Sequence, residues 1–242
     1  MAQIGFKCDR GVVRKNNEDA CFVIPSDDVY IVADGVGGNS SGEVASRTAV
    51  SEIALMVNDM NMKQLKSAEE IFGFFDKVIS SVNEKIYKMG RSDRAYRGMA
   101  TTVVIAYLRN GSAYIANVGD SRAYLLRDKE IKRVTTDHTY VNELVTKGVI
   151  TEAEAETHEQ RNVITRALGA EPKVKPDFYK FRVFKEDVIM LCSDGLYGEV
   201  SEKDIVEIIL LSDDMNDASH NLVAKACHEG GRDNITVVCL KI

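Results

Sequence analysis

The sequence lacks several features that would indicate a membrane or linker protein. It contains no tryptophan and only three prolines in 242 residues, which excludes a Pro-rich linker and leaves Phe and Tyr as its aromatic residues. No segment approaches the roughly 20 consecutive apolar residues of a membrane-spanning helix. The N-terminus also has no apolar stretch typical of a signal peptide. We therefore expect a cytoplasmic protein with no membrane insertion.

Cysteine is also scarce. The five cysteines are an odd number and contain no C-x-x-C pair: Cys8, Cys21, Cys192, Cys227 and Cys239. Two of them, Cys192 and Cys239, lie within apolar runs, where a reduced cysteine behaves as a small hydrophobic residue. A disulfide framework is not expected, and a reducing compartment fits this cysteine usage.

The chain has no excess of basic charge. Lys and Arg number 31 against 37 Asp and Glu, a formal net charge of −6, whereas a nucleic-acid surface is basic. We expect no nucleic-acid partner. Hydrophobic residues make up 45% and charged residues 28%, which is typical of a folded globular chain. The length is sufficient for a buried core.

Hydrophobic periodicity predicts strands and helices in alternating blocks. The expected strands are Ala20–Ile24, Val29–Ala33, Thr101–Leu108, Ser112–Asn117, Arg122–Leu126, Val188–Ser193 and Ile235–Ile242. The expected helices run from Ser41 to about Asn58, from the capping box Ser67–Glu70 onward, from Ser201 to Leu211, and over Asp217–His228. This pattern favours an α+β fold in which two sheets pack as a sandwich with helices outside.

One stretch interrupts that pattern. Residues 135–168 are polar, have weak strand character and carry their own capping box, Thr151–Glu154. We interpret them as a helical flap inserted into a single domain that spans residues 1–242.

Acidic residues recur beside predicted strands. Three Asp–Gly or Gly–Asp pairs follow strand-like runs, and two other pairs that contain Asp precede such runs: Asp34–Gly35, Gly119–Asp120, Asp194–Gly195, Glu18–Asp19 and Asp233–Asn234. Each pair alone is explained by ordinary turn chemistry. Carboxylates that converge repel one another unless a cation neutralises them, and oxygen ligands without His or Cys favour Mg²⁺ or Mn²⁺. Five such sites together indicate a divalent-metal centre.

Two competing phosphate-binding patterns fit the sequence less well. Gly37 and Gly42 have the glycine spacing of a nucleotide P-loop, but Glu43 stands where the lysine is required, and the spacing also fails the dinucleotide fingerprint. Cys8 and Arg14 match the C-x₅-R spacing that lets a thiolate and a guanidinium share one phosphate. Because Asp9 is expected to raise the thiol pKa and so oppose thiolate formation, we interpret Cys8 as structural.

Seven segments in order resemble the metal-dependent Ser/Thr protein phosphatases (PPM, or type 2C), especially the compact bacterial members. The resemblance extends from Gly5 to Ile242. The segments are Arg14–Asp19, Asp34–Ser46, Gly98–Val103, Asn117–Arg122, Ile164–Gly169, Leu191–Gly195 and Gly231–Thr236. It implies two antiparallel sheets in a sandwich, with Mn²⁺ or Mg²⁺ at one end, and hydrolysis of phosphoserine or phosphothreonine by a hydroxide that bridges two ions.

The resemblance also implies roles for particular residues. Asp34 would bridge two core ions, Asp194 and Asp233 would complete the first site, and the Gly35 carbonyl would join the second. Arg14 would hold the substrate phosphate.

Further acidic positions match weaker family sites. Asp19, with Glu18, would act through water on the second ion, and Asp120 with Asp194 would bind a third, weaker ion. Asn234 and Glu18 stand where they would support the ligands or bind metal themselves.

Two positions depart from the family pattern. Some members, mainly eukaryotic, place His where this chain has Val36, and relatives often carry Pro where it has Glu159. Neither position is a ligand, but the donor of the leaving-group proton is left unassigned. Two alternatives stay open: a catalytically silent phosphoprotein-binding regulator of the same fold, and a metal-dependent phosphoesterase for nucleotides or nucleic acid.

The implied partners are phosphorylated proteins, including a cognate Ser/Thr kinase and the targets of that kinase. We expect the chain to be a monomer.

Overall fold

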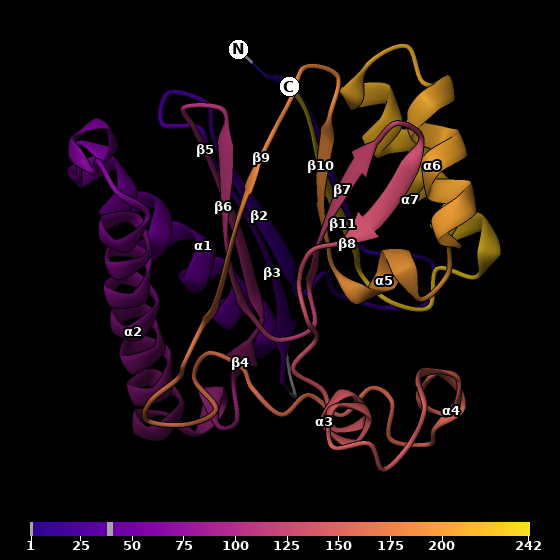
Figure 1. Ribbon diagram of the computed structural model, residues 1–242. Coiled ribbons are helices and arrows are strands. Elements are labelled where there is room, and N and C mark those ends of the chain that lie inside the picture. The colour runs from indigo at the N-terminus through magenta and orange to yellow at the C-terminus, as the bar shows by residue number, and fades with distance from the viewer. Residues whose placement is uncertain (1, 38–40) are drawn as a thin grey trace.

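A computed structural model describes residues 2–37 and 41–242. It is a sandwich of two antiparallel sheets with helices on both outer faces (Figure 1). This arrangement confirms the predicted α+β sandwich. Residues 38–40 of the Gly-rich segment, which fall in the P-loop-like pattern, lie outside the described residues.

The two sheets share the strands almost equally. One sheet has the order β1-β11-β10-β7-β8, and the other has the order β2-β3-β5-β6-β9 with β4 paired to β3. The strands of the first sheet are β1 (Gln3–Asp9), β7 (Arg122–Arg127), β8 (Glu130–Arg133), β10 (Val188–Cys192) and β11 (Ile235–Lys241). Those of the second are β2 (Asp19–Ile24), β3 (Val29–Val36), β4 (Ala100–Thr101), β5 (Val103–Arg109), β6 (Ser112–Val118) and β9 (Asp177–Arg182).

Helices cover the outer face of each sheet. In Figure 1, α1 (Ser41–Asp59) and α2 (Ala68–Ser92) lie against the second sheet, while α6 (Glu202–Leu211) and α7 (Met215–Glu229) lie against the first. The short elements are η1 (Met62–Gln64), η2 (Arg94–Tyr96), α3 (Tyr140–Thr146), α4 (Glu152–Thr157) and α5 (Asp194–Tyr197). None of the described helices is long and apolar enough to cross a membrane.

Three apolar layers hold the sandwich together. One lies between α1, α2 and their sheet, one between α6, α7 and theirs, and the third between the two sheets. α2 shows how the sequence builds a layer: Ser67 caps it by accepting a hydrogen bond from the Glu70 N–H, and Glu70 completes the predicted capping box. Its apolar positions recur at helical spacing and are buried: Ile71, Phe75, Val78, Ile79, Val82 and Ile86.

Several strands have weak sequence signals, and the sequence analysis did not predict them. β1, β8 and β9 were not expected, because they are edge or partly exposed strands whose side chains do not alternate cleanly. The Asn110–Gly111 turn between β5 and β6 is as predicted, with positive φ of 50° and 67°. Asp34 and Gly35, expected just after a strand, lie within β3 because β4 pairs with its last residues.

The segment 135–168 contains two short helices, α3 and α4, and the second begins at the predicted Thr151–Glu154 capping box. In Figure 1 both helices lie below the sandwich, next to the end where β3 ends and α5 begins. We call residues 135–168 the flap.

Candidate metal centre

Five aspartates gather where β3 ends and α5 begins. Asp19 opens β2, Asp34 lies near the end of β3, and Asp120 follows β6. The other two, Asp194 and Asp233, flank the first sheet at the start of α5 and just before β11. Both sheets therefore supply carboxylates to one end of the sandwich.

Asp19 and Asp34 face each other directly across the β2–β3 ladder. Opposite residues of antiparallel strands have Cβ atoms about 4.5–5.5 Å apart, where like charges destabilise the pair. Asp19 is buried, and its Oδ2 accepts a 2.7 Å hydrogen bond from the Ser193 hydroxyl. This bond joins the two sheets at the site, because Ser193 follows β10.

Two threonines fix the backbone of Asp34. Its N–H donates to Thr102 Oγ1 at 2.9 Å, and its carbonyl accepts from the Thr101 hydroxyl at 2.9 Å and from the Thr102 N–H at 2.8 Å. The Thr102 hydroxyl also lies 2.6 Å from that of Ser121, next to Asp120. Thr101 and Thr102 belong to a motif that the sequence analysis identified, but they had no assigned role.

Asp120 sits in a tight turn between the two sheets. Gly119 before it has a φ of +103°, and a Cβ there would lie 2.6 Å from the Thr102 side chain, so the turn requires glycine. The Tyr197 hydroxyl donates to the Asp120 carbonyl at 3.0 Å. The Arg122 guanidinium lies 3.4 Å from the centre of the Tyr197 ring and binds Asp137 through two nitrogens.

Arg14 forms an ion pair with Asp233. The Arg14 Nη2 to Asp233 Oδ2 distance is 2.6 Å, and the Arg14 side chain is 51% exposed. Burial lowers the pKa of Arg14, but Asp233 outweighs it and the net direction is upward, so the guanidinium stays charged. The sequence analysis brought both residues to the site but did not predict their contact.

Glu18, Gly35 and Asn234 form a hydrogen-bonded support. The Gly35 N–H donates to the Glu18 carbonyl at 3.0 Å, and a Cβ on Gly35 would lie 2.2 Å from the Gly42 carbonyl oxygen. Asn234 accepts from the Glu18 N–H at 2.7 Å and donates to the carbonyls of Arg10 and Asn16. Its amide therefore holds the loop that carries Arg14.

The five carboxylates interact electrostatically. The pKa of Asp34 is raised well above its ordinary value. The largest cause is loss of hydration on burial, and the next is repulsion from the other four aspartates, Asp19, Asp194, Asp120 and Asp233. Burial and Asp194 raise the pKa of Asp120 to about 7, and burial and Asp233 raise that of Asp194 to about 6. An added cation would relieve this repulsion.

Three buried carboxylate oxygens show that a cation suits the donor set. Asp19 Oδ1, Asp120 Oδ1 and Asp194 Oδ1 are buried without a hydrogen-bond partner. Unpaired buried oxygens are costly, and a hard divalent ion prefers such ligands. Within residues 2–37 and 41–242, however, no three acidic, histidine or cysteine side chains are already arranged around one point. Two of the carboxylates are held by other partners in this arrangement, Asp233 by Arg14 and Asp19 by Ser193.

Cys8 lies behind this site and does not face Arg14. Its Sγ accepts from the Thr236 hydroxyl at 3.0 Å and from Asn17 Nδ2 at 3.2 Å. A hydrogen bond with Cys21, with help from Thr236 and Asn17, lowers the Cys8 pKa to about 6 although burial and Asp9 raise it. Asp9 raises the Cys8 pKa as expected, but these hydrogen bonds outweigh it, so the net direction is downward.

His138 links the flap to the Asp120 turn. Its Nδ1 accepts from the Gly119 N–H at 2.9 Å, and its Nε2 lies 3.1 Å from Asp177 Oδ2. Arg166 Nη1 donates to Asp177 Oδ1 at 2.9 Å. Sequence analysis missed this cluster, because its members come from distant segments and carry no motif spacing.

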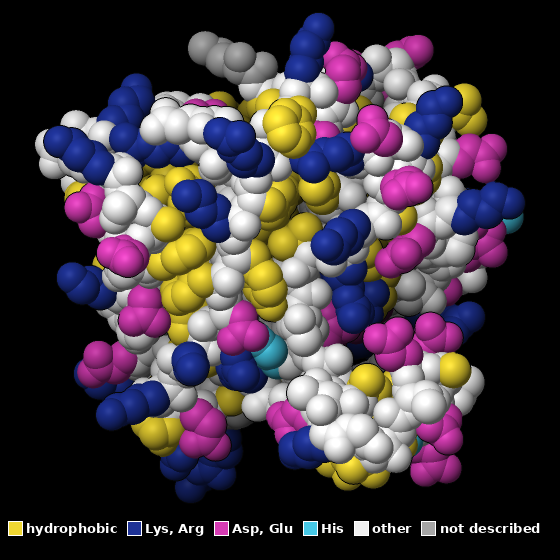
Figure 2. Space-filling view, in the orientation of Figure 1, with side chains coloured by type: hydrophobic (Ala, Val, Ile, Leu, Met, Phe, Trp, Pro, Cys, Tyr) yellow, Lys and Arg dark blue, Asp and Glu magenta, His cyan; other side chains and the backbone are white. Residues whose placement is uncertain are grey.

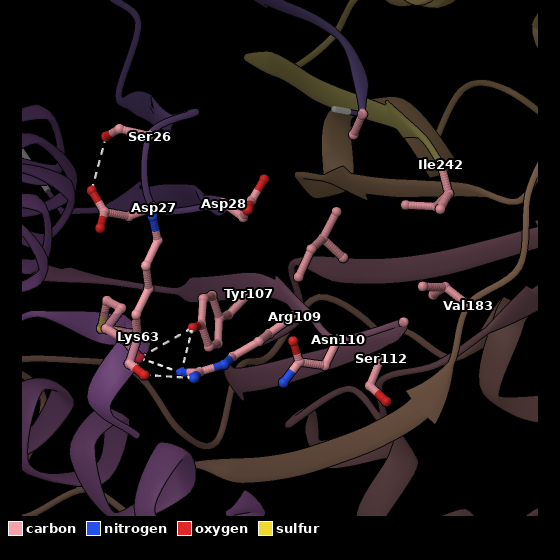
Figure 3. Close-up of a pocket in the computed structure, with 14 residues that line it drawn as sticks. Ser26, Asp27, Asp28, Lys63, Tyr107, Arg109, Asn110, Ser112, Val183 and Ile242 are labelled. Carbon is pink, nitrogen blue, oxygen red and sulfur yellow. Dashed lines mark hydrogen bonds between the residues drawn. The ribbon is translucent and has the colours of Figure 1, made fainter. Parts of the chain in front are cut away.

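A pocket of about 660 Å³ lies away from the aspartates, at the turn between β2 and β3 (Figure 3). It is lined by Ser26–Asp28, which form the opposite end of the β2–β3 hairpin from Asp19 and Asp34. β2 spans six residues, about 20 Å at 3.3 Å per residue. Arg109 in this pocket donates to the Met62 and Lys63 carbonyls, so its charge already has partners. The pocket is separate from the carboxylates.

Comparison with known proteins agrees with the geometry. The sequence model of the family described as Protein phosphatase 2C matches residues 12–226. A serine/threonine phosphatase, stp, from Listeria monocytogenes serotype 4b (strain F2365) is 38% identical over 239 residues, covering 98% of this chain and 94% of the relative.

Solved structures show the same architecture. Serine/threonine phosphatase Stp1 from Staphylococcus aureus superposes with a TM-score of 0.92 at 34% identity, covering 100% of this chain and 95% of that one. The catalytic domain of the phosphatase PstP, solved in complex with two manganese ions, has a TM-score of 0.86 at 32% identity, covering 99% and 97%. The chain therefore belongs to the protein phosphatase 2C family.

Proposed function

We propose that this protein phosphatase removes phosphate from phosphoserine and phosphothreonine, using Mn²⁺ or Mg²⁺ held by the clustered aspartates. The main support for a metal site is that three buried carboxylate oxygens, on Asp19, Asp120 and Asp194, have no hydrogen-bond partner. The phosphatase activity itself follows from family membership.

The proposed ligands divide between two core ions and a third. Asp34, the residue whose pKa all four other aspartates raise, would bridge the core ions, with Asp194 and Asp233 at the first. The Gly35 carbonyl and Asp19 would serve the second, Asp19 through water. A bound pair of such ions lowers the pKa of water and polarises a phosphoryl group.

The remaining acidic and amide residues complete this assignment. Asp120 and Asp194, whose unpaired oxygens are buried, would hold the third ion. Glu18 and Asn234 would position the loop that carries Arg14, as their hydrogen bonds already do.

Arg14 would bind the substrate phosphate. A guanidinium presents two parallel N–H donors, which suit a phosphate group. Arg14 now contacts Asp233 at 2.6 Å, and its side chain is half exposed, so it can exchange the carboxylate for a phosphate. That exchange would also release Asp233 Oδ2 to bind a cation. The same movement thus prepares the phosphate site and the metal site.

The substrates we propose are phosphorylated proteins, including a cognate Ser/Thr kinase and the targets of that kinase, and the acting form is a monomer. The relatives named serine/threonine phosphatase support the substrate class. A silent regulator of this fold would lack one or more of the carboxylates, and this chain retains all five. The silent alternative is therefore not favoured.

Hydrolysis of a phosphothreonine peptide with Mn²⁺ and then with excess EDTA tests the proposal. We expect phosphate release with Mn²⁺ alone, and its loss in Asp34→Ala and Asp194→Ala. Asp76→Asn, an exposed change on α2, is the matched control and should keep full turnover. Binding of Mn²⁺, followed by calorimetry, should weaken in both alanine variants. A folded wild type that binds Mn²⁺ and releases no phosphate would contradict the enzymatic role, and turnover that survives EDTA would contradict the metal role.

A further inference from the structure

A second pocket lies beside the candidate metal centre. It has a volume of about 570 Å³ and forms between the end of α2, the segment that leads into β4, and the turn after the flap. Its lining residues are Tyr87, Gly90, Arg91, Arg97, Gly98, Met99, Ala100, Gly169 and Ala170. None of these has a role in the proposed chemistry.

The pocket begins within two residues of Asp34. Ala100, which lines it, pairs with Val36 across the β3–β4 ladder, and Thr101 pairs with Gly35. Paired residues of antiparallel strands have Cα atoms about 4.5–5.5 Å apart. The Thr101 hydroxyl donates to the Asp34 carbonyl at 2.9 Å. A peptide whose phosphoresidue lies at the metal centre can therefore reach this pocket.

The pocket carries positive charge that the described part of the chain does not neutralise. Arg91 and Arg97 are exposed, and no described carboxylate forms an ion pair with either. Arg91 lies 5.0 Å from the centre of the Tyr87 ring, which steadies the guanidinium. The neighbouring Asp93 uses its carboxylate to cap η2, accepting from the Ala95 N–H at 2.8 Å. Figure 2 shows Lys and Arg side chains gathered below the lower end of α2.

A buried asparagine holds the opposite wall in place. Asn83 on α2 accepts from the Gly169 N–H at 2.8 Å and donates to the Glu171 carbonyl at 3.1 Å. Gly169 has a φ of +84°, and a Cβ there would lie 2.4 Å from Ile86. The wall is therefore fixed before any peptide arrives, which lowers the entropic cost of binding.

We propose that this pocket binds an acidic side chain of the phosphoprotein substrate, a few residues from the phosphorylated Ser or Thr. The inference rests on the proposed function. An extended peptide advances about 3.3 Å per residue, so a residue a few positions from the phosphoresidue can lie over β4, which pairs with the end of β3 next to Asp34. Two guanidinium groups that pair with no described carboxylate are complementary to the carboxylate of a substrate Asp or Glu.

Matched phosphothreonine peptides test the proposal. One series carries a single Glu at each position from four residues before to four residues after the phosphothreonine. The companion series carries Gln, and a third carries Leu, at the same positions. We expect the Glu peptide to exceed the Gln peptide about fivefold in kcat/KM at one or more of these positions, as an ion pair of about 1 kcal/mol gives. The preference should weaken as salt rises.

Substitution of the arginines identifies where any preference arises. In Arg91→Gln/Arg97→Gln the ratio of Glu to Gln peptide should fall to about one, while Arg94→Gln, which changes a nearby arginine that does not line the pocket, should keep it. Equal rates for Glu and Gln peptides in the wild type, a preference for Leu, or a Glu preference that survives the double variant would each overturn the proposal.

A binding measurement keeps this test separate from catalysis. Fluorescence anisotropy of the same labelled peptides in EDTA reports the Glu-to-Gln ratio of affinities without turnover. Failure of the proposed function removes hydrolysis of every peptide and leaves the binding ratio measurable. A binding ratio of one in the wild type would refute the pocket assignment even where hydrolysis proceeds.

Discussion

Replacing Asp120 by Asn tests how much the burial of this carboxyl makes the free energy of unfolding depend on pH. Burial and Asp194 raise the pKa of Asp120 from 3.8 to about 7. The folded protein holds this proton more tightly than the unfolded chain does. The protonated carboxyl therefore contributes its full stabilisation of the fold below pH 3.8. That stabilisation is lost as the pH rises to about 7. The metal-free protein is thus expected to be less stable at pH 8 than at pH 5.

The size of the effect on stability follows from the pKa shift of Asp120. Each tenfold change in the protonation equilibrium is worth about 1.4 kcal/mol, so the whole displacement is worth about 4 kcal/mol. Between pH 5 and pH 8 the share is about 3 kcal/mol. Asp120→Asn keeps the shape and cannot ionise. It should remove this share of the pH dependence.

Urea denaturation in EDTA at pH 5 and pH 8 measures the difference directly. We expect the free energy of unfolding of the wild type to fall more between these two pH values than that of Asp120→Asn, by about 3 kcal/mol. Asp76→Asn, on the exposed face of α2, serves as the control and should follow the wild type. Parallel profiles for the wild type and Asp120→Asn would refute the reasoning.

Four other substitutions test separate parts of the structure. Cys8→Ser should keep Mn²⁺-dependent turnover within about twofold, because the thiol faces Asn17 and not the substrate arginine; an inactive variant would revive the cysteine mechanism. Arg14→Lys should lower kcat/KM about tenfold, since lysine lacks the two-pronged donor, and unchanged kinetics would contradict this. Asn83→Ala should cost about 1–2 kcal/mol in urea denaturation by removing the buried amide that binds the Gly169 N–H and the Glu171 carbonyl. Ser67→Ala should cost about 1 kcal/mol in the same assay by removing the α2 cap, and an unchanged midpoint for either variant would argue against the bonds described.

The sequence predicted the parts of the site that local patterns encode. Asp34, Asp120 and Asp194 each adjoin a glycine and a strand-like run, and the structure brings all three together. The strands that pack on both faces, such as β10, were also expected, because a fully buried strand appears as a continuous apolar run.

The remaining features depend on contacts that no local pattern encodes. The ion pair of Arg14 with Asp233 joins residues 219 positions apart. His138 contacts the Gly119 turn only because the flap folds back onto it. β9 has no regular alternation of buried and exposed residues, so its pairing with β6 could not be anticipated from periodicity. Tertiary packing, not propensity, decides such elements.

Because the carboxylates are divided between two sheets, the rate of catalysis depends on how the two sheets pack against each other. Asp19 and Asp34 move with one sheet, whereas Asp194 and Asp233 move with the other. The apolar layer between the sheets, which includes Tyr30 and its neighbours, sets their spacing. A substitution that slides one sheet past the other would thus lower phosphate release while leaving every acidic residue intact. Measuring the turnover of variants in this inner layer would therefore report how precisely the packing fixes the position of one sheet relative to the other.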